Sequence, residues 1–162
     1  MAELAGKEFV VVPINGRQCL LERGAPDSSG VYVDFLSAAL SHRAGSGLRQ
    51  QAISRAVGIK PGRLPRVLDA TAGFGKDAFL LACQGCEVTL LERDEKVFEL
   101  LRDGLGRGLA TADGAALESL QRLRLQNCDF LALQAATAEW DVVYLDPMFP
   151  EAKKSARVKK EM

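Results

Sequence analysis

The sequence predicts an α/β fold with a doubly wound, mostly parallel sheet. Short apolar runs of the kind that buried parallel strands show occur at 66–70, 87–91, 123–126 and 140–145. Stretches with helical apolar spacing separate the first three runs, and strands that alternate with helices are typical of a parallel sheet. Asn15-Gly16 lies between two further apolar runs and predicts a separate β-hairpin.

The N-terminal part should be a small hairpin and helical segment. Its expected elements are strands at 9–14 and 18–22 and helices at 34–42 and 48–57. Pro61-Gly62 and Pro65 then interrupt the pattern before the first strand of the parallel sheet. We therefore expect an N-terminal segment, 1–62, and a core domain, 63–162.

The core helices have separate signals. Residues 78–83 have helical apolar spacing after a glycine turn, and a further helix is expected near 115–120. Asp94 can cap a third helix, in which four apolar residues recur at every fourth position: Val97, Leu101, Leu105 and Leu109.

Composition narrows the functional class. The 162 residues suffice for one domain, with 48% hydrophobic and 26% charged residues and a formal net charge of zero. No run reaches 18 apolar residues and the first residues lack a secretory apolar region, so we expect a cytoplasmic protein without a membrane span.

Cys83-x-x-Cys86 could be a redox or zinc pair, but no second cysteine pair exists and His42 is the only histidine. We expect reduced, structural thiols and no metal.

A glycine turn gives the first functional signal. Gly73 and Gly75 follow a predicted strand and precede a predicted helix, the arrangement that brings backbone N–H groups against a ligand. Glu92 ends the next strand, 19 residues after Gly73, where a carboxylate that binds a ribose is expected. This pattern alone also fits an ordinary βα turn or a nicotinamide dehydrogenase.

The last predicted strand gives the second signal. It ends at Asp146-Pro147-Met148-Phe149, at the edge of the sheet where ligands bind in open α/β folds. This group is similar to the Asp/Asn-Pro-Pro-Phe/Tyr motif of amino-group methyltransferases, with Met148 in place of the second proline. Asp146 and the Pro147 carbonyl would hold the two N–H bonds of an amine, and Phe149 would stack on its ring. A turn residue at Asp146 and a core residue at Phe149 are the simpler alternatives.

Together these motifs resemble one family, the bacterial 16S ribosomal RNA guanine-N2 methyltransferases (RsmJ, also called YhiQ). The similar segments are 30–35, 41–43, 56–60, 68–79, 91–93, 143–150, 153–156 and 158–162. The resemblance implies a Rossmann-like methyltransferase fold, S-adenosylmethionine (AdoMet) as cofactor, and small-subunit ribosomal RNA or the ribosomal subunit as partner. Members of the family are longer, so we expect the chain to be C-terminally truncated relative to them.

The resemblance and the strand ends together give a set of expected cofactor-binding residues: Asp69, Gly73, Gly75, Lys76, Asp77, Glu92, Arg93, Cys128, Asp129 and Asp146. Of these, Lys76 and Asp77 rest on the resemblance, and the Cys128-Asp129 pair could be a plain turn. Four further residues match the family without an assigned role: Tyr32, Asp34, His42 and Arg43.

Basic residues cluster on both sides of the expected site. Between residues 41 and 66 the chain has six basic and no acidic residues, and residues 153–160 are also rich in lysine. Either these segments contact phosphates or they are solvated surfaces.

Three functions stay open, namely rRNA guanine-N2 methylation, methylation of another planar amine (adenine N6, cytosine N4 or glutamine), and RNA binding without catalysis.

Overall fold

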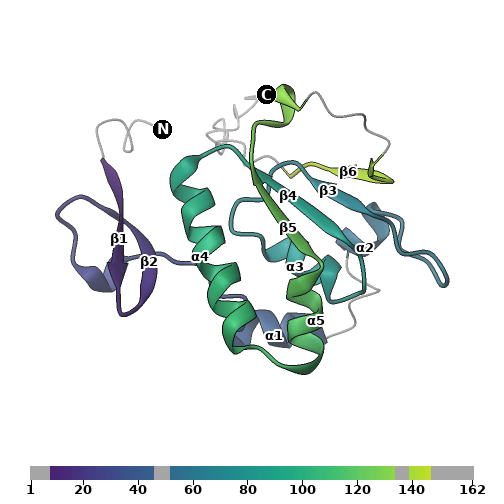
Figure 1. Ribbon diagram of the computed structural model, residues 1–162, viewed down its shortest axis with the longest axis horizontal. Coiled ribbons are helices and arrows are strands. Elements are labelled where there is room, and N and C mark those ends of the chain that lie inside the picture. Colours follow the sequence, from purple (N-terminus) through teal and green to yellow (C-terminus); the bar gives the residue numbers. More distant parts are fainter. Residues whose placement is uncertain (1–7, 46–51, 134–138, 147–162) are drawn as a thin grey trace, which may run out of the picture.

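The computed structural model describes residues 8–45, 52–133 and 139–146. Its main sheet has four parallel strands in the order β5-β4-β3-β6 (Figure 1). These strands are β3 (Val67–Asp69), β4 (Val88–Glu92), β5 (Leu123–Asn127) and β6 (Val142–Tyr144). The chain runs outward from β3 to β5 and then returns to the other side of β3, so the expected parallel α/β sheet is confirmed.

The helices that connect these strands pack on the sheet. They are α3 (Lys76–Ala82), α4 (Glu95–Thr111) and α5 (Gly114–Gln121). Val67, Val88 and Leu123 stand in register on neighbouring strands and are buried in one core with residues of these helices. Two short 3-10 turns, η1 (Asp27–Ser29) and η3 (Phe130–Ala132), lie in the connections.

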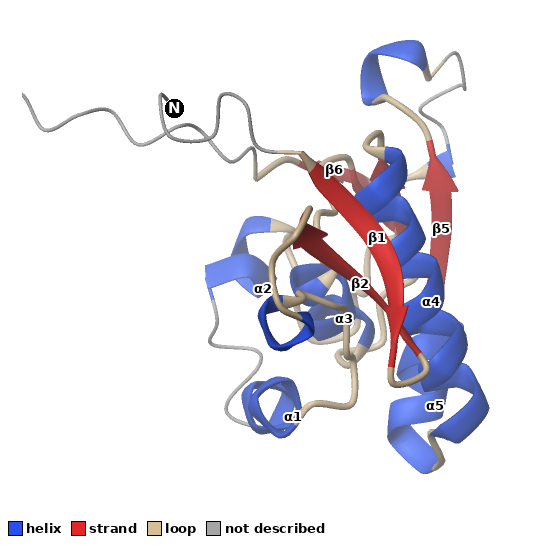
Figure 2. Ribbon diagram, turned by 90° about the vertical axis from the view of Figure 1, so that its left-hand side faces the viewer, coloured by secondary structure: helices blue, strands red, loops and turns tan. Residues whose placement is uncertain are grey.

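The N-terminal hairpin is confirmed. It consists of β1 (Phe9–Ile14) and β2 (Arg17–Glu22), and both turn residues have positive φ, 49° at Asn15 and 75° at Gly16. Positive φ at both positions is the requirement of a type I′ turn. The hairpin lies on the side of α4 that faces away from the sheet (Figures 1 and 2). The Lys96 ammonium donates a 2.8 Å hydrogen bond to the Phe9 carbonyl across this contact.

The first N-terminal helix begins later than expected, and the second is described only in part. The first, α1 (Ala38–Gly45), does not begin at Asp34, because the Asp34 carboxylate accepts a hydrogen bond from the Leu36 backbone N–H (3.0 Å) and forms a local turn. The second, α2 (Ala52–Ala56), covers the end of the expected helix at 48–57, and residues 48–51 lie outside the described ones.

Helix α4 begins as expected, and its predicted apolar face is confirmed at Leu101 and Leu105 but not at Leu109. The Asp94 carboxylate accepts hydrogen bonds from the backbone of Lys96 (2.9 Å) and Val97 (3.0 Å). The buried residues of the helix are Leu100, Leu101, Gly104 and Gly108, whereas Leu109 is 41% exposed. Each step of four residues advances about 40° around a helix, so a strict four-residue repeat does not stay on one face.

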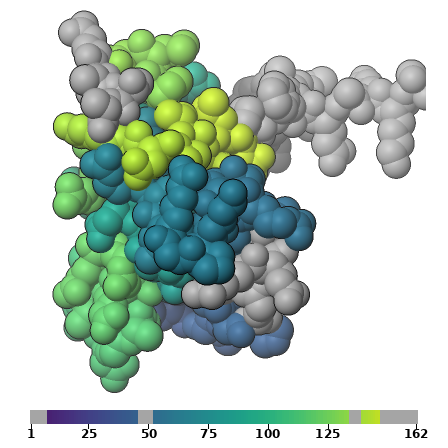
Figure 3. Space-filling model, turned by 90° about the vertical axis from the view of Figure 1, so that its right-hand side faces the viewer, coloured from purple at the N-terminus to yellow at the C-terminus, as the bar shows by residue number. Residues whose placement is uncertain are grey.

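Strand β6 also differs from expectation. The sequence predicts a fully buried strand, but Val143 is 39% and Leu145 54% exposed. β6 lies at an edge of the described sheet and pairs with β3 alone among the described strands, so less of it is covered. Residues 139–146 are visible on the surface beside 52–66 (Figure 3). In the described part of the chain, no helix combines the length and apolarity needed to cross a membrane.

Candidate active site at the carboxyl ends of the strands

The glycine turn joins β3 to α3 in a conformation that requires glycine. Gly73 has φ +52° and Gly75 has φ +67°. A Cβ on Gly75 would lie 2.9 Å from the Leu101 side chain and 3.1 Å from those of Leu90 and Phe35. The atom nearest to a Cβ built on Gly73 would be the Thr71 carbonyl oxygen, at 3.9 Å. The turn is therefore packed tightly underneath at Gly75, and a ligand can approach its backbone at Gly73.

Glu92 connects this turn to the end of β4. Its carboxylate accepts hydrogen bonds from the backbone N–H of Gly73 (3.0 Å) and of Asp94 (2.8 Å). The Asn127 amide at the end of β5 donates to the Glu92 carbonyl (2.8 Å). A carboxylate offers about four acceptor positions, so Glu92 keeps capacity for ligand hydroxyls.

Asp69 lies below the turn and is 2% exposed. Its carboxylate accepts a 3.1 Å hydrogen bond from the Thr71 N–H. Burial raises the pKa of Asp69 to about 6, and the negative charges of Asp77, Asp146 and Glu92 add to this rise, against the opposing effect of the Thr71 N–H. Four acidic groups thus converge at one edge of the sheet, and their field favours a cationic ligand.

Asp146 follows β6 and lies beside the glycine turn. Its backbone N–H donates a 2.8 Å hydrogen bond to the Thr71 hydroxyl, which joins the two sequence motifs directly. The Asp146 side chain is exposed. Two other expected catalytic residues, Pro147 and Phe149, lie outside the described residues.

The ends of β4 and β5 also meet as expected. The Arg93 guanidinium lies 3.4 Å from the Asp129 carboxylate. Asp129 also accepts a hydrogen bond from the Leu131 N–H (2.9 Å) and so caps η3. These contacts, the Leu131 N–H first and Arg93 second, hold the pKa of Asp129 below its usual value. The neighbouring Cys128 thiol contacts the Asp129 carbonyl (3.2 Å), so this pair has a structural role in the turn.

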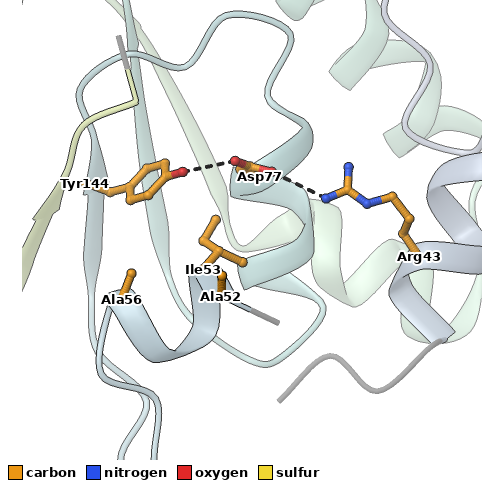
Figure 4. A pocket seen from close by; sticks show the side chains of 6 residues that line it. All are labelled: Arg43, Ala52, Ile53, Ala56, Asp77 and Tyr144. Atoms are coloured by element: carbon orange, nitrogen blue, oxygen red, sulfur yellow. Dashed lines mark hydrogen bonds and ion pairs between the residues drawn. The ribbon is translucent and has the colours of Figure 1, made fainter. Parts of the chain in front are cut away.

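A cavity of about 500 Å³ adjoins the site and is lined by Arg43, Ala52, Ile53, Ala56, Asp77 and Tyr144 (Figure 4). The Tyr144 hydroxyl donates a 3.1 Å hydrogen bond to one Asp77 oxygen, and the Arg43 guanidinium lies 3.8 Å from the other. Burial and the Asp77 charge raise the pKa of Tyr144 well above its usual value.

Sequence reasoning did not identify this cavity or the role of Tyr144 in it. Its walls come from α1, α2, α3 and β6, and no local motif marks residues that meet only in the folded chain. Of the residues that matched the family without a role, Arg43 alone lines it. Tyr32 packs against the Arg17 guanidinium instead, and His42 is exposed on α1. Lys76 is exposed at the start of α3.

Three of the cysteines, Cys19, Cys83 and Cys86, lie apart from the carboxyl ends of the strands. All four are free, and burial raises the pKa of Cys86 to about 11 and that of Cys83 above its usual value. Buried thiols of high pKa are inert structural groups. Within the described ranges, no three His, Cys, Asp or Glu side chains are grouped so that they could hold a metal ion.

Comparisons with known proteins place the chain in a family. Residues 5–162 match the model of a family described as putative SAM-dependent methyltransferase. The chain is 48% identical over 161 residues to the ribosomal RNA small subunit methyltransferase J of Cronobacter sakazakii, and it is 53% identical over 146 residues to that of Salmonella arizonae. These matches cover 98% and 88% of this chain but 64% and 58% of the relatives, so the chain spans about 60% of their length.

A solved structure supports the same assignment. The crystal structure of a SAM-dependent methyltransferase from Neisseria gonorrhoeae superposes with a TM-score of 0.71 and 29% identity, over 89% of this chain and 58% of that one. The Rossmann-like fold and the resemblance seen in the sequence are confirmed, whereas a nicotinamide dehydrogenase is not supported. By its sequence and its fold, the chain belongs to the SAM-dependent methyltransferase family.

Proposed function

We propose that the protein transfers a methyl group from AdoMet to the exocyclic N2 amine of a guanine in small-subunit ribosomal RNA. The names of its relatives support small-subunit ribosomal RNA as the substrate, and the choice of the guanine N2 amine rests on the resemblance seen in the sequence. The observation that carries the proposal is the 2.8 Å hydrogen bond from the Asp146 N–H to the Thr71 hydroxyl. It holds Asp146, the first residue of the proposed amine-binding motif, against the glycine turn after β3, so cofactor and acceptor would meet there.

The residues at this edge fit AdoMet. The acidic groups around Asp69 suit its sulfonium and ammonium charges, and the open backbone at Gly73 accommodates a close approach. Glu92 would accept hydrogen bonds from the ribose hydroxyls, in addition to those from Gly73 and Asp94. When bound, AdoMet supplies an electrophilic methyl group on sulfur.

The proposed cofactor site has two parts. The glycine turn, with Asp69, Gly73, Gly75, Lys76 and Asp77, would hold the methionine end. The strand ends after β4 and β5 would hold the nucleoside end, through Glu92, Arg93, Cys128 and Asp129. The Arg93–Asp129 ion pair supports this second part, because it brings the two strand ends together.

The amine would be held by the segment after β6. The Asp146 carboxylate and the Pro147 carbonyl would accept its two N–H bonds, which aligns the nitrogen with the methyl group. Phe149 would stack on the guanine, which must leave its helix to reach the site. For Pro147 and Phe149 this role rests on the sequence motif.

A basic surface beside β6 would contact the RNA backbone. Its described members are exposed, namely Arg55, Lys60, Arg63 and Arg66. The segment that carries them lies next to β6 (Figure 3), and the Arg66 backbone N–H donates to Asp141 just before that strand (2.8 Å). Neutralising phosphates at this surface would position the RNA without reading its sequence. Such an enzyme would work in the cytoplasm, with residues 1–62 as a segment distinct from the catalytic core.

The test is methyl transfer from labelled AdoMet to small-subunit rRNA, either free or assembled, followed by nucleoside analysis. We expect the label in N2-methylguanosine. Label in N6-methyladenosine, N4-methylcytidine or protein would replace guanine with another planar amine. RNA binding without any transfer would support the non-catalytic alternative.

A further inference from the structure

The cavity beside the glycine turn has one charge of each sign on its wall. Arg43 of α1 and Asp77 of α3 face each other at 3.8 Å, with side chains 50% and 34% exposed (Figure 4). This distance is longer than the 2.7–2.9 Å that is typical of charged N–H···O hydrogen bonds. An exposed pair of this kind contributes at most about 1 kcal/mol. Replacing this one contact by contacts to a ligand would therefore cost little.

Tyr144 fixes the orientation of the acidic partner. Its hydroxyl donates to Oδ2 of Asp77 (3.1 Å), which leaves Oδ1 directed toward Arg43. The other lining side chains, Ala52, Ile53 and Ala56, are small or aliphatic. A wall with a carboxylate, a guanidinium and apolar neighbours matches a zwitterion on a short aliphatic chain, which is the amino-acid end of AdoMet.

We propose that Arg43 binds the α-carboxylate at the methionine end of the cofactor, opposite Asp77, which the proposed function already places there. Asp77 would accept hydrogen bonds from the α-ammonium group, and Arg43 would donate to the α-carboxylate. Asp77 is two residues after Gly75, so a methionine moiety lying over the glycine turn would extend into this cavity. The inference rests on the proposed use of AdoMet and gives a role to Arg43, which the sequence alone leaves without one.

Three ligands separate this role from general effects on the site. S-adenosylhomocysteine has the whole amino-acid end, decarboxylated AdoMet has the amine without the carboxylate, and methylthioadenosine has neither. By calorimetry, Arg43→Gln should weaken S-adenosylhomocysteine binding about tenfold (1.4 kcal/mol) and leave the other two affinities unchanged. Asp77→Asn should weaken binding of the two amine-bearing ligands but not of methylthioadenosine. Arg43→Lys, which keeps the charge, should lose less affinity than Arg43→Gln.

Arg102→Gln is the matched control, because Arg102 is exposed on α4 and does not line the cavity. It should leave all three affinities unchanged. An equal loss for all three ligands in Arg43→Gln would overturn the inference in favour of a structural role. Unchanged S-adenosylhomocysteine affinity with weaker rRNA binding would overturn it in favour of a phosphate contact. A wild-type protein that binds none of the ligands would instead reject the proposed function itself, and the inference with it.

Discussion

The backbone N–H of Gly73 donates a 3.0 Å hydrogen bond to the carboxylate of Glu92. This bond ties the turn after β3 to the end of β4, across 19 residues of sequence. The second Glu92 oxygen accepts from Asp94 N–H, at the start of α4. Glu92 therefore holds the proposed cofactor turn in place, and we propose that it also binds the ribose.

Glu92→Ala should weaken S-adenosylhomocysteine binding about tenfold or more. Hydrogen bonds to a charged acceptor contribute roughly 1.5–3 kcal/mol, and the variant loses both the ribose contact and the support of the turn. Calorimetry measures the effect. Glu87→Ala is the control, since Glu87 is exposed just before the same strand, and its affinity should equal that of the wild type. Equal affinities in both variants would remove Glu92 from the cofactor site.

Asp146→Ala should lower methyl transfer at least about a hundredfold, on the scale of losing one group that stabilises a transition state. RNA affinity should be largely retained, because the backbone bond to Thr71 remains. The control is Glu139→Ala, which removes an exposed carboxylate shortly before the same strand and should leave methyl transfer unchanged. Phe149→Ala should cost roughly 1–3 kcal/mol of base stacking. Near-normal turnover of Asp146→Ala and Phe149→Ala would remove the motif after β6 from the active site.

Asp69→Asn should stabilise the protein above pH 6 but not near pH 4. The pKa of Asp69 is raised to about 6, so the folded state favours its protonated form, and stability from this group is lost as the pH rises toward and through 6. Asparagine stays neutral and keeps an acceptor for the Thr71 N–H. The gain at pH 7 should be on the order of 2 kcal/mol. Urea unfolding between pH 4 and pH 8 tests this, and parallel curves for both proteins would contradict it.

Two glycines of α4 should respond in opposite ways to alanine. A Cβ at Gly104 would lie 2.6 Å from Val33 Cγ1 and 2.9 Å from the Val33 carbonyl oxygen, so Gly104→Ala should destabilise the fold by about 1–3 kcal/mol. At Gly106 no atom lies within 4 Å of such a Cβ. Gly106→Ala should therefore stabilise the helix by about 0.5–1 kcal/mol. Denaturant unfolding compares the two variants, and similar effects would show that Val33 can move aside.

Features that depend on a few neighbouring residues could be predicted from the sequence. The hairpin turn follows from Asn15-Gly16, because both residues tolerate positive φ. The start of α4 follows from Asp94, whose carboxylate reaches N–H groups two and three residues ahead. The alternation of strands and helices predicts a parallel sheet. Because the glycine turn, Glu92 and Asp146 each come at the end of a strand, they are expected at the same edge of that sheet.

Only the tertiary structure determines which residues from distant parts of the chain contact these groups. The placement of β6 beside β3 brings Tyr144 to Asp77, and the packing of α1 brings Arg43 to the same carboxylate. The exposed positions of β6 and the buried glycines of α4 likewise depend on which elements cover them. Burial and long-range contacts depend on the packing of the whole chain, whereas turns and caps are formed by hydrogen bonds between residues a few positions apart.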